Sequence, residues 1–312
     1  MMRGSAANVA ALLVALIAGR PSGAQGAPLP QSVLAVRDRA GGVREFWSAM
    51  SAPVTWPRAM LAARMAWRPA ANGVEWGELE LRGSGEAWRT RLIVARMEPA
   101  RVRLALDTAF TPGREAAWTL ARAPKAAVLA VNAGQFEATM PWGWVVLDGR
   151  RWLPPQHGPL SAALVQDSSG TLRWIRGDDV ARVAATATGV RWAFQSYPAI
   201  LVGDTVPLPL RRAGLGIDVA HRDARAGICL TRDGQLLVAL TRFDGAGQAL
   251  HFIPFGLTVP EMAAVLGALG CQDAMLLDGG ISARLLVRDK DGAAHQWEGL
   301  RDVPLGLVAL PR

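Results

Sequence analysis

Short apolar runs separated by turn residues make up most of the hydrophobic pattern of the chain. Residues 91–96 and 101–106 alternate in part between polar and apolar positions, and Glu-Pro-Ala at 98–100 separates them as a turn. Residues 126–131 are apolar throughout, which is typical of a strand buried at the centre of a sheet. The pattern therefore predicts a sheet-containing core.

The C-terminal half predicts a hairpin and then the best-defined helix of the chain. The apolar runs 227–231 and 235–240 lie on either side of an Asp-Gly pair, which is a strong hairpin signal. Thr258 can cap a helix, and Glu261 three residues later completes a capping box. The apolar residues that follow have helical spacing, and Gly270 ends the helix.

Two further segments predict helices. Residues 41–70 favour a helical hairpin broken at Pro53 and Pro57, and the alanine-rich residues 114–122 favour a single helix. Together with the strands, these helices predict an α+β fold, with a mixed β-sheet core and flanking helices in a single main domain.

The amino terminus has the pattern of a secretory signal peptide. Arg3 precedes an apolar stretch at residues 9–18, and small residues follow where a signal peptidase reads. This stretch is shorter than the roughly 20 residues of a spanning helix, although a retained membrane anchor is the alternative. We expect a signal peptide at 1–24, a partly helical extension at 25–72, a main domain at 73–312, and a periplasmic or secreted protein.

The chain is basic, and arginine supplies nearly all of its positive charge. The net charge of +8 falls to +6 when the signal peptide takes Arg3 and Arg20 with it. A basic exported protein suits acidic glycans, phosphate-bearing polymers or an anionic envelope surface. The arginines are scattered along the chain, and the chain is expected to be exported, so we expect no nucleic-acid partner. The sequence after residue 24 has no apolar run of spanning length, so we expect no stable membrane insertion.

The two cysteines, Cys229 and Cys271, form an even pair that could bond in an oxidising compartment. Both lie in or beside apolar stretches, where a free cysteine often serves as a small buried apolar residue. Spacing alone does not decide between a disulfide and two free thiols.

Several common catalytic motifs are missing from the sequence. It contains no G-x-S-x-G, P-loop, H-E-x-x-H or C-x-x-C pattern. The four histidines are far apart and have no metal-ligand spacing. We therefore predict no metal site and no cofactor.

Polar residues at the ends of predicted strands remain as candidates. Asn132 follows an apolar run, and Gly134 would let a ligand approach the backbone, but Asn132 could equally cap a turn. Arg225 precedes a predicted strand and could bind phosphate with its guanidinium. The alternative for Arg225 is a surface ion pair with Asp218 or Asp223.

Asp278 follows the apolar residues 274–277 and precedes Gly279 and Gly280. A carboxylate at the end of a buried strand is partly desolvated, which raises its pKa and suits it to acid/base or nucleophilic chemistry. The two glycines would let the backbone curl around a ligand. The alternative is an ordinary Asp-Gly-Gly turn.

Taken in order, these residues resemble motifs of the phosphodiester glycosidase family, from about Gly73 to the C-terminus. The closing signature, at 269–280, is the most specific. The other matching motifs are Asn132-Ala133-Gly134-Gln135-Phe136, Pro141-Trp142-Gly143-Trp144, Gln195-Ser196-Tyr197-Pro198, Arg225 with Gly227 and Asp233-Gly234, and Gly256-Leu257-Thr258. Ala133, Gln135 and Ile281 depart from the family pattern.

The resemblance implies an exported hydrolase that releases a sugar from a sugar-1-phosphodiester, with a glycan or sugar phosphodiester as substrate. Arg225 and Asp278 would be catalytic, Arg225 by binding the phosphodiester and Asp278 as nucleophile or general base. Glu261 is a possible second carboxylate, although its capping role explains it already. The residues expected to bind substrate are Asn132, Gly134, Gln195, Gly279, Gly280 and Ser282.

Two other functions also fit the sequence. A non-catalytic envelope protein could bind polysaccharide or protein with the same cleft, since the chain has 12 tryptophans that could stack on sugars or fill the core. A general phosphodiesterase would act without a sugar attached through its anomeric position.

Overall fold

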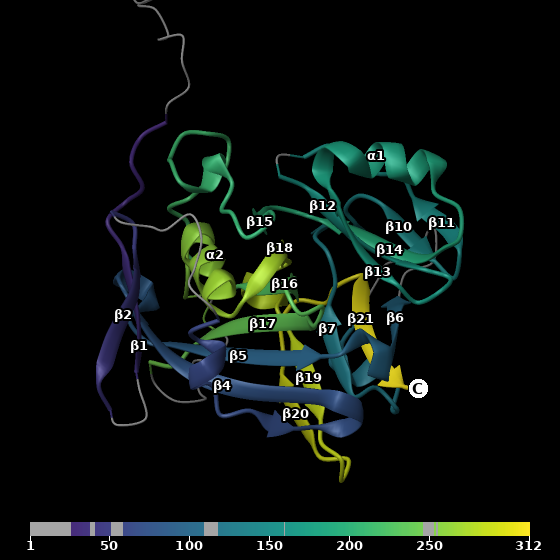
Figure 1. Cartoon of the computed structure of the whole chain (residues 1–312), viewed down its shortest axis with the longest axis horizontal. Helices are drawn as coiled ribbons and strands as arrows, with labels where there is room; N and C mark the ends of the chain where they lie inside the picture. The colour runs from purple at the N-terminus through teal and green to yellow at the C-terminus, as the bar shows by residue number, and fades with distance from the viewer. Residues whose placement is uncertain are drawn as a thin grey trace, which may run out of the picture.

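The residues that the structure describes form three antiparallel sheets, two α-helices and a small two-stranded hairpin (Figure 1). Residues 1–24, where the signal peptide is predicted, lie outside the described residues. The computed structural model describes residues 26–37, 41–50, 59–108, 118–158, 160–245, 253 and 255–312.

The largest sheet has nine strands. They are β1 (Val33–Arg37), β2 (Val43–Ser48), β3 (Arg68–Pro69), β4 (Val74–Gly83), β5 (Thr90–Met97), β15 (Ala199–Leu201), β16 (Ala226–Thr231), β17 (Leu236–Phe243) and β18 (Cys271–Leu277). Their order is β15-β18-β16-β17-β5-β4-β1-β2, and β3 pairs with β4.

Two five-stranded sheets lie beside it, at the right of Figure 1. One contains, in order, β11 (Arg150–Leu153), β10 (Val145–Leu147), β14 (Val190–Ser196), β12 (Ala162–Asp167) and β13 (Leu172–Arg176). The other contains, in order, β20 (Ala294–Trp297), β19 (Leu285–Arg288), β7 (Leu129–Asn132), β21 (Leu305–Pro311) and β6 (Val102–Thr108). The hairpin is β8 (Phe136–Glu137) with β9 (Met140–Pro141).

Both faces of the nine-stranded sheet are buried. In β17, Leu236, Val238 and Leu240 belong to a core shared with the two smaller sheets. Leu237 and Ala239, on the opposite face, belong to a core that includes helix α2 (Val259–Ala268). Figure 1 shows α2 beside β15 and β18, and helix α1 (Gly177–Thr186) over the sheet that contains β12.

The predicted α+β class with a mixed sheet is wrong, because the fold is mostly β. Only two α-helices occur in the part of the chain that the structure describes, and all its named strand pairs are antiparallel. Continuous apolar runs are typical of parallel strands buried on both faces. Here the strands are antiparallel but are also buried on both faces, because the smaller sheets cover one face and helix α2 covers the other.

The two helices expected outside the C-terminal half are not found in the described residues. Strand β2 occupies part of residues 41–70, and its Trp47 is buried in the core beside α2. Pro53 and Pro57 lie outside the described residues. Of residues 114–122, the described part forms an isolated bridge and a 3-10 turn, Leu120–Arg122. Tertiary packing outweighs the weak helix preference of alanine-rich sequence here.

Three local predictions are confirmed. Strands β16 and β17 form the expected hairpin. Helix α2 has its capping box, with the Thr258 side chain accepting from the Glu261 N–H and the Glu261 carboxylate accepting from the Thr258 N–H. Strands β5 and β6 match the two alternating runs, but the turn between them leads from one sheet to another.

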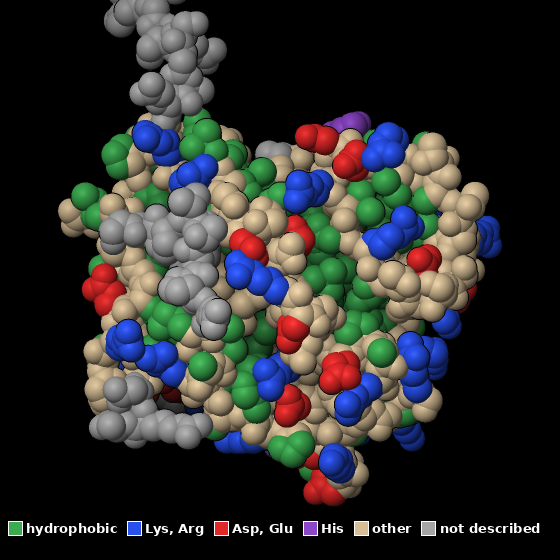
Figure 2. All heavy atoms as spheres, viewed as in Figure 1, with side chains coloured by type: hydrophobic (Ala, Val, Ile, Leu, Met, Phe, Trp, Pro, Cys, Tyr) green, Lys and Arg blue, Asp and Glu red, His purple; other side chains and the backbone are tan. Residues whose placement is uncertain are grey.

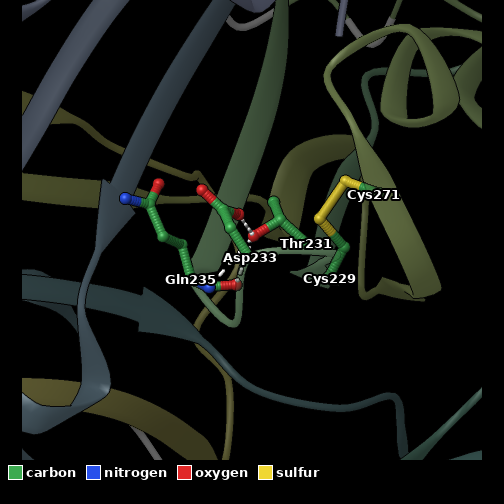
Figure 3. Close-up of a disulfide and its surroundings, with 5 residues drawn as sticks. All are labelled: Cys229, Thr231, Asp233, Gln235 and Cys271. Carbon is green, nitrogen blue, oxygen red and sulfur yellow. Dashed lines mark hydrogen bonds between the residues drawn. A yellow bond between two sulfur atoms is a disulfide. The ribbon is translucent and has the colours of Figure 1, made fainter. Parts of the chain in front are cut away.

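The two cysteines form a disulfide. Cys229 in β16 and Cys271 in β18 are joined across 5.7 Å between their Cα atoms. Figure 3 shows the bond beside the β16–β17 turn, where the hydroxyl of Thr231 bonds Asp233. The disulfide therefore fastens neighbouring strands at the end opposite to the residues that follow β18 and precede β16.

The surface carries mixed charge. On the face shown in Figure 2, Lys and Arg side chains are interspersed with Asp and Glu, with apolar side chains between them. None of the helices in the described ranges is long and apolar enough to cross a membrane.

Candidate active site

Neighbouring strands of the nine-stranded sheet end at one cavity. Asp278 directly follows β18, and Arg225 directly precedes β16. Because these strands are antiparallel neighbours, with Ala226 opposite Leu277, the two side chains start from adjacent positions. The cavity has a volume of about 350 Å³ and is lined by Gln135, Tyr197, Pro198, Gly216, Ile217, Asp218, Asp223, Arg225, Val259, Leu276, Leu277, Asp278 and Gly279.

The backbone of Asp278 is fixed from a different sheet. Its N–H donates to the Gly134 carbonyl over 3.0 Å, and its carbonyl accepts from Asn132 Nδ2 over 2.8 Å. The Asn132 Oδ1 accepts from the Arg284 N–H over 3.0 Å. The buried amide at the end of β7 therefore binds both the residue after β18 and the residue before β19.

The carboxyl group of Asp278 is in an environment that disfavours its charge. Burial raises the pKa of Asp278 above its ordinary value, and the nearby Asp223 carboxylate adds to the rise. A hydrogen bond from Ser282 and the charge of Arg301 act in the opposite direction. A carboxyl group with a raised pKa inside a cavity is suited to proton transfer or nucleophilic attack.

Asp223 supplies a second carboxyl group to the same cavity. Burial raises its pKa, while the charge of Arg225 opposes the rise. Its Oδ1 is buried and has no hydrogen-bond partner among the described residues. Two carboxyl groups at one sugar site are the usual apparatus of glycoside hydrolysis. From the sequence, Asp223 was expected only as an ion-pair partner of Arg225. Asp223 lies two residues before Arg225, and this proximity was the one sequence feature that could have indicated a shared site.

Arg225 is held by the backbone around it. Its Nε donates to the Leu257 carbonyl over 2.8 Å, and its Nη2 donates to the His221 carbonyl over 2.6 Å. Its own N–H donates to Thr241 Oγ1 over 2.7 Å. These side-chain hydrogen bonds go to carbonyls rather than to the aspartates expected in the alternative. The guanidinium is thus fixed at the cavity wall, where it can donate to a phosphate oxygen.

Two of the predicted amides lie behind the cavity wall. Asn132 and Gln195 are each 1% exposed. The Gln195 Oε1 accepts from the N–H groups of Trp144 and Gln156, over 2.9 and 3.1 Å. Its Nε2 donates to the Gln156 carbonyl over 2.7 Å. The Asn132 amide therefore fixes the Asp278 backbone, and the Gln195 amide fixes the segments at Trp144 and Gln156.

The glycines after Asp278 allow the chain to turn tightly. A Cβ on Gly279 would lie 2.6 Å from the Ala224 carbonyl oxygen. Gly280 has a φ of +56°, and a Cβ there would lie 2.9 Å from Asp223 Oδ2. Any side chain would therefore displace the loop that carries Asp223.

The predicted site residues divide into two groups. Asp278, Arg225 and Gly279 line the cavity. The others are not among its lining residues: Asn132, Gly134, Gln195, Gly280 and Ser282. Asn132, Gly134 and Ser282 bond Asp278, whereas the Gln195 amide bonds Trp144 and Gln156.

Glu261 has a structural environment away from this cavity. It is fully buried and receives two hydrogen bonds of 2.7 Å from the Arg222 guanidinium. It also accepts from Ser32 Oγ and from the Thr258 N–H. These contacts agree with its predicted capping role.

Arg301 is a cation that the sequence pattern did not indicate. Its guanidinium lies over the Phe136 ring, 4.6 Å from the centroid, and its charge lowers the pKa of Asp278. It belongs to an exposed loop far along the chain, so no local signal connected it with Asp278.

A second cavity, of about 260 Å³, lies near the disulfide and is lined in part by Trp67, Arg96, Arg232 and Cys271. Its charged side chains are largely paired, because Arg232 bonds Asp204 over 2.6 Å and Arg96 bonds Glu75 over 2.7 Å. The cavity at Asp278 contains two carboxyl groups whose pKa values are raised by burial, and it is therefore the better candidate. The described ranges contain no group of three His, Cys, Asp or Glu residues placed to hold a metal ion.

Comparison with known protein families assigns this chain to a class of hydrolases. The family model described as phosphodiester glycosidase matches residues 125–310, which include Asn132, Arg225 and Asp278. The chain belongs to this family.

Solved structures share the fold. One is the catalytic domain of zebrafish N-acetylglucosamine-1-phosphodiester alpha-N-acetylglucosaminidase, auto-inhibited by its pro-peptide, with 16% identity, a TM-score of 0.57, and coverage of 79% of this chain and 88% of that one. Another is a hypothetical protein from Synechocystis, with 15% identity, a TM-score of 0.51, and coverage of 87% of this chain. The chain spans 65% of the length of the Synechocystis protein. None of the curated proteins matches the chain.

Proposed function

We propose that the protein is an exported hydrolase that cleaves a sugar-1-phosphodiester and releases the sugar, such as N-acetylglucosamine, from envelope or extracellular glycans. The observation that carries this proposal is the pair of carboxyl groups, Asp278 and Asp223, that line one cavity together with Arg225 in a phosphodiester glycosidase family member.

The bond that breaks joins the anomeric carbon to the bridging phosphate oxygen. Asp278 acts at the anomeric carbon as nucleophile or general base, and water supplies the hydroxyl that remains on the sugar. The departing phosphate monoester has a second pKa near 6 and is a good leaving group, roughly as for phosphorylated side chains. Arg225 then matters more than a strong proton donor, because it offsets the charge on the leaving phosphate.

Asp223 serves as the second carboxyl group. Burial raises the pKa of both carboxyl groups, and the Asp223 carboxylate raises the pKa of Asp278 further, so one can be ionised while the other holds a proton. This state provides both a base and an acid around the reacting bond.

The direct test is release of N-acetylglucosamine from UDP-N-acetylglucosamine by the wild-type protein and by Asp278→Asn. We expect release by the wild type and a decrease of kcat/KM by about 10²–10⁴-fold in the variant, with its circular dichroism unchanged. Arg225→Ala should lose about 10²–10³-fold. Binding without turnover, across several sugar phosphodiesters, would instead support a non-catalytic glycan-binding protein. Equal release by Asp278→Asn would remove Asp278 from the mechanism.

Export is part of the same proposal. It rests on the signal-peptide pattern at residues 1–24 and is supported by the Cys229–Cys271 disulfide, because disulfides persist in oxidising compartments. The test is the N-terminal sequence of protein recovered from the periplasm or medium of a bacterial host. A chain that keeps residues 1–24 and stays in the cytosol would contradict it.

A further inference from the structure

Three adjacent strands place an aromatic ring on the other side of Asp278 from Arg225. The strand order is β15-β18-β16. Tyr197 lies just before β15 and Arg225 just before β16, while Asp278 follows the central strand β18. All these pairings are antiparallel, so the three residues lie at the same end of the sheet. With strands about 4.8 Å apart, the two flanking backbones are roughly 10 Å apart, with Asp278 between them.

Tyr197 is tightly fixed. Gln135 Nε2 donates to the carbonyls of Tyr197 and Leu277, over 3.2 Å each. The next residue, Pro198, accepts from the Leu276 N–H over 3.0 Å. The Trp142 ring packs edge-to-face on Tyr197 at 4.7 Å between centroids. Tyr197 is half-buried and is one of the residues that line the cavity, and its ring is held by the contact with Trp142.

The two walls of the cavity differ in chemistry. The wall that contains Arg225, Asp223 and Asp218 is charged, whereas Tyr197 is aromatic and is backed by Trp142. A sugar-1-phosphodiester has the same division, with C–H groups on its ring face and charge on its phosphate. Aromatic rings present an apolar body for such C–H faces.

Building on the proposed function, we propose that Tyr197 is the platform on which the substrate's pyranose ring stacks, so that the phosphate points toward Arg225 and the anomeric carbon lies at Asp278. Tyr197 thereby determines specificity for the sugar and not for the group beyond the phosphate.

Two substrates that share only the sugar and phosphate test this proposal: UDP-N-acetylglucosamine and the methyl phosphodiester of N-acetylglucosamine 1-phosphate. We expect Tyr197→Ala to raise KM about tenfold for both, with kcat changed less than threefold, and Tyr197→Phe to restore most of the affinity. The control is Trp88→Ala, which removes an exposed aromatic ring that does not line the cavity.

Other results would overturn the proposal. A higher KM for the uridine substrate alone would place the nucleobase on Tyr197, and an equal loss in Tyr197→Phe would assign the effect to the hydroxyl. If the wild type hydrolyses neither substrate, the proposed function fails, and calorimetric titration with N-acetylglucosamine 1-phosphate tests the platform separately. Binding that is weakened about tenfold by Tyr197→Ala supports it, and unchanged or absent binding overturns it.

Discussion

Asp278 has a pKa that depends on its acidic neighbour. The Asp223 carboxylate raises the pKa of Asp278, so Asp223→Asn should lower it. If ionised Asp278 is the reactive form, wild-type kcat/KM is lost as pH falls through a pKa above 3.8. The acid limb should therefore move to lower pH in Asp223→Asn, even if the maximum rate falls. The measurement is kcat/KM of both proteins from pH 3 to 8.

The matched control is Asp218→Asn, which removes another carboxylate from the cavity wall. Burial, Ser282, Arg301, Asp223 and Arg284 determine the pKa of Asp278. Asp218 is not among them, so the acid limb should stay in place. A limb that moves equally in both variants would mean that net charge in the cavity, rather than the Asp223–Asp278 pair, determines it.

Asp278 also links activity to stability. Its folded pKa is raised above 3.8, so its favourable contribution to folding is complete below pH 3.8 and is lost as pH rises through the folded pKa. Asp278→Asn should therefore melt about 1–3 °C higher than the wild type at pH 7, with the difference vanishing near pH 3.5. Scanning calorimetry at both pH values checks this. A variant that melts lower at pH 7 would show that the ionised carboxylate stabilises the fold.

The sequence predicts Asp278 and Arg225 as site residues because each stands at the end of an apolar run, and both line the same cavity. It did not place Asp223, Tyr197 or Arg301 around Asp278, because these residues come from loops whose position depends on strand order. Asn132 was a candidate for contact with sugar, yet its amide is used to join two sheets. A polar residue near a glycine has the same local sequence whether it contacts a ligand or bonds the backbone of the protein.

At the scale of elements, the disulfide is expected to stabilise the β16–β18 pair. For its sequence separation of 42, the loss of denatured-state entropy corresponds to about 4 kcal/mol of stabilisation. The stabilisation that disulfides typically provide is about 2–4 kcal/mol. The double substitution Cys229→Ala with Cys271→Ala should lower the free energy of unfolding by that amount, as measured with urea. Because the bond lies at the far end of the strands from Asp278, kcat at 25 °C should remain within about threefold.

Reductant provides the control for this prediction. It should destabilise the wild type to the level of the double variant and leave the double variant unchanged. Equal stability of all four samples would mean that the hydrogen bonds and apolar contacts of β16 and β18 suffice to hold the pair.

Elements with strong local signals were predicted well. The β16–β17 hairpin has an Asp-Gly turn, and α2 has a capping box, so short-range chemistry determines both. The segments expected to be helical from alanine content lack such signals. In β2, burial of Trp47 and pairing with β1 decide the conformation instead.

At the scale of the whole molecule, strand pairing could not be derived from the sequence. Strands β5 and β6 are neighbours along the chain but belong to different sheets, and β1 joins β4 from a distance. A run such as Leu236–Phe243 is buried on both faces, so its pattern does not show whether helices or another sheet cover it. A strand buried on both faces fits a parallel, mixed or antiparallel sheet equally well, so the expected mixed sheet did not follow from the pattern.

The N-terminal part of the chain donates a hydrogen bond to a buried carboxylate of the site-bearing part, and that carboxylate is also paired with an arginine. Ser32, just before β1, donates to Glu261 of α2, which also binds Arg222, the neighbour of Asp223. Glu261→Gln would leave the largely buried Arg222 charge without its partner. It should lower the free energy of unfolding by about 3–5 kcal/mol in urea titrations.

An exposed pair of the same kind serves as the control. Arg182 bonds Asp179 over 2.7 Å on the surface of α1, so Asp179→Asn should change the free energy of unfolding by no more than about 0.5 kcal/mol. Ser32→Ala keeps the Arg222–Glu261 pair and loses one charge-assisted hydrogen bond, which places it between the two, at about 1.5–3 kcal/mol. If Glu261→Gln costs no more than Asp179→Asn, the buried Arg222–Glu261 pair contributes no more to stability than the exposed Arg182–Asp179 pair does.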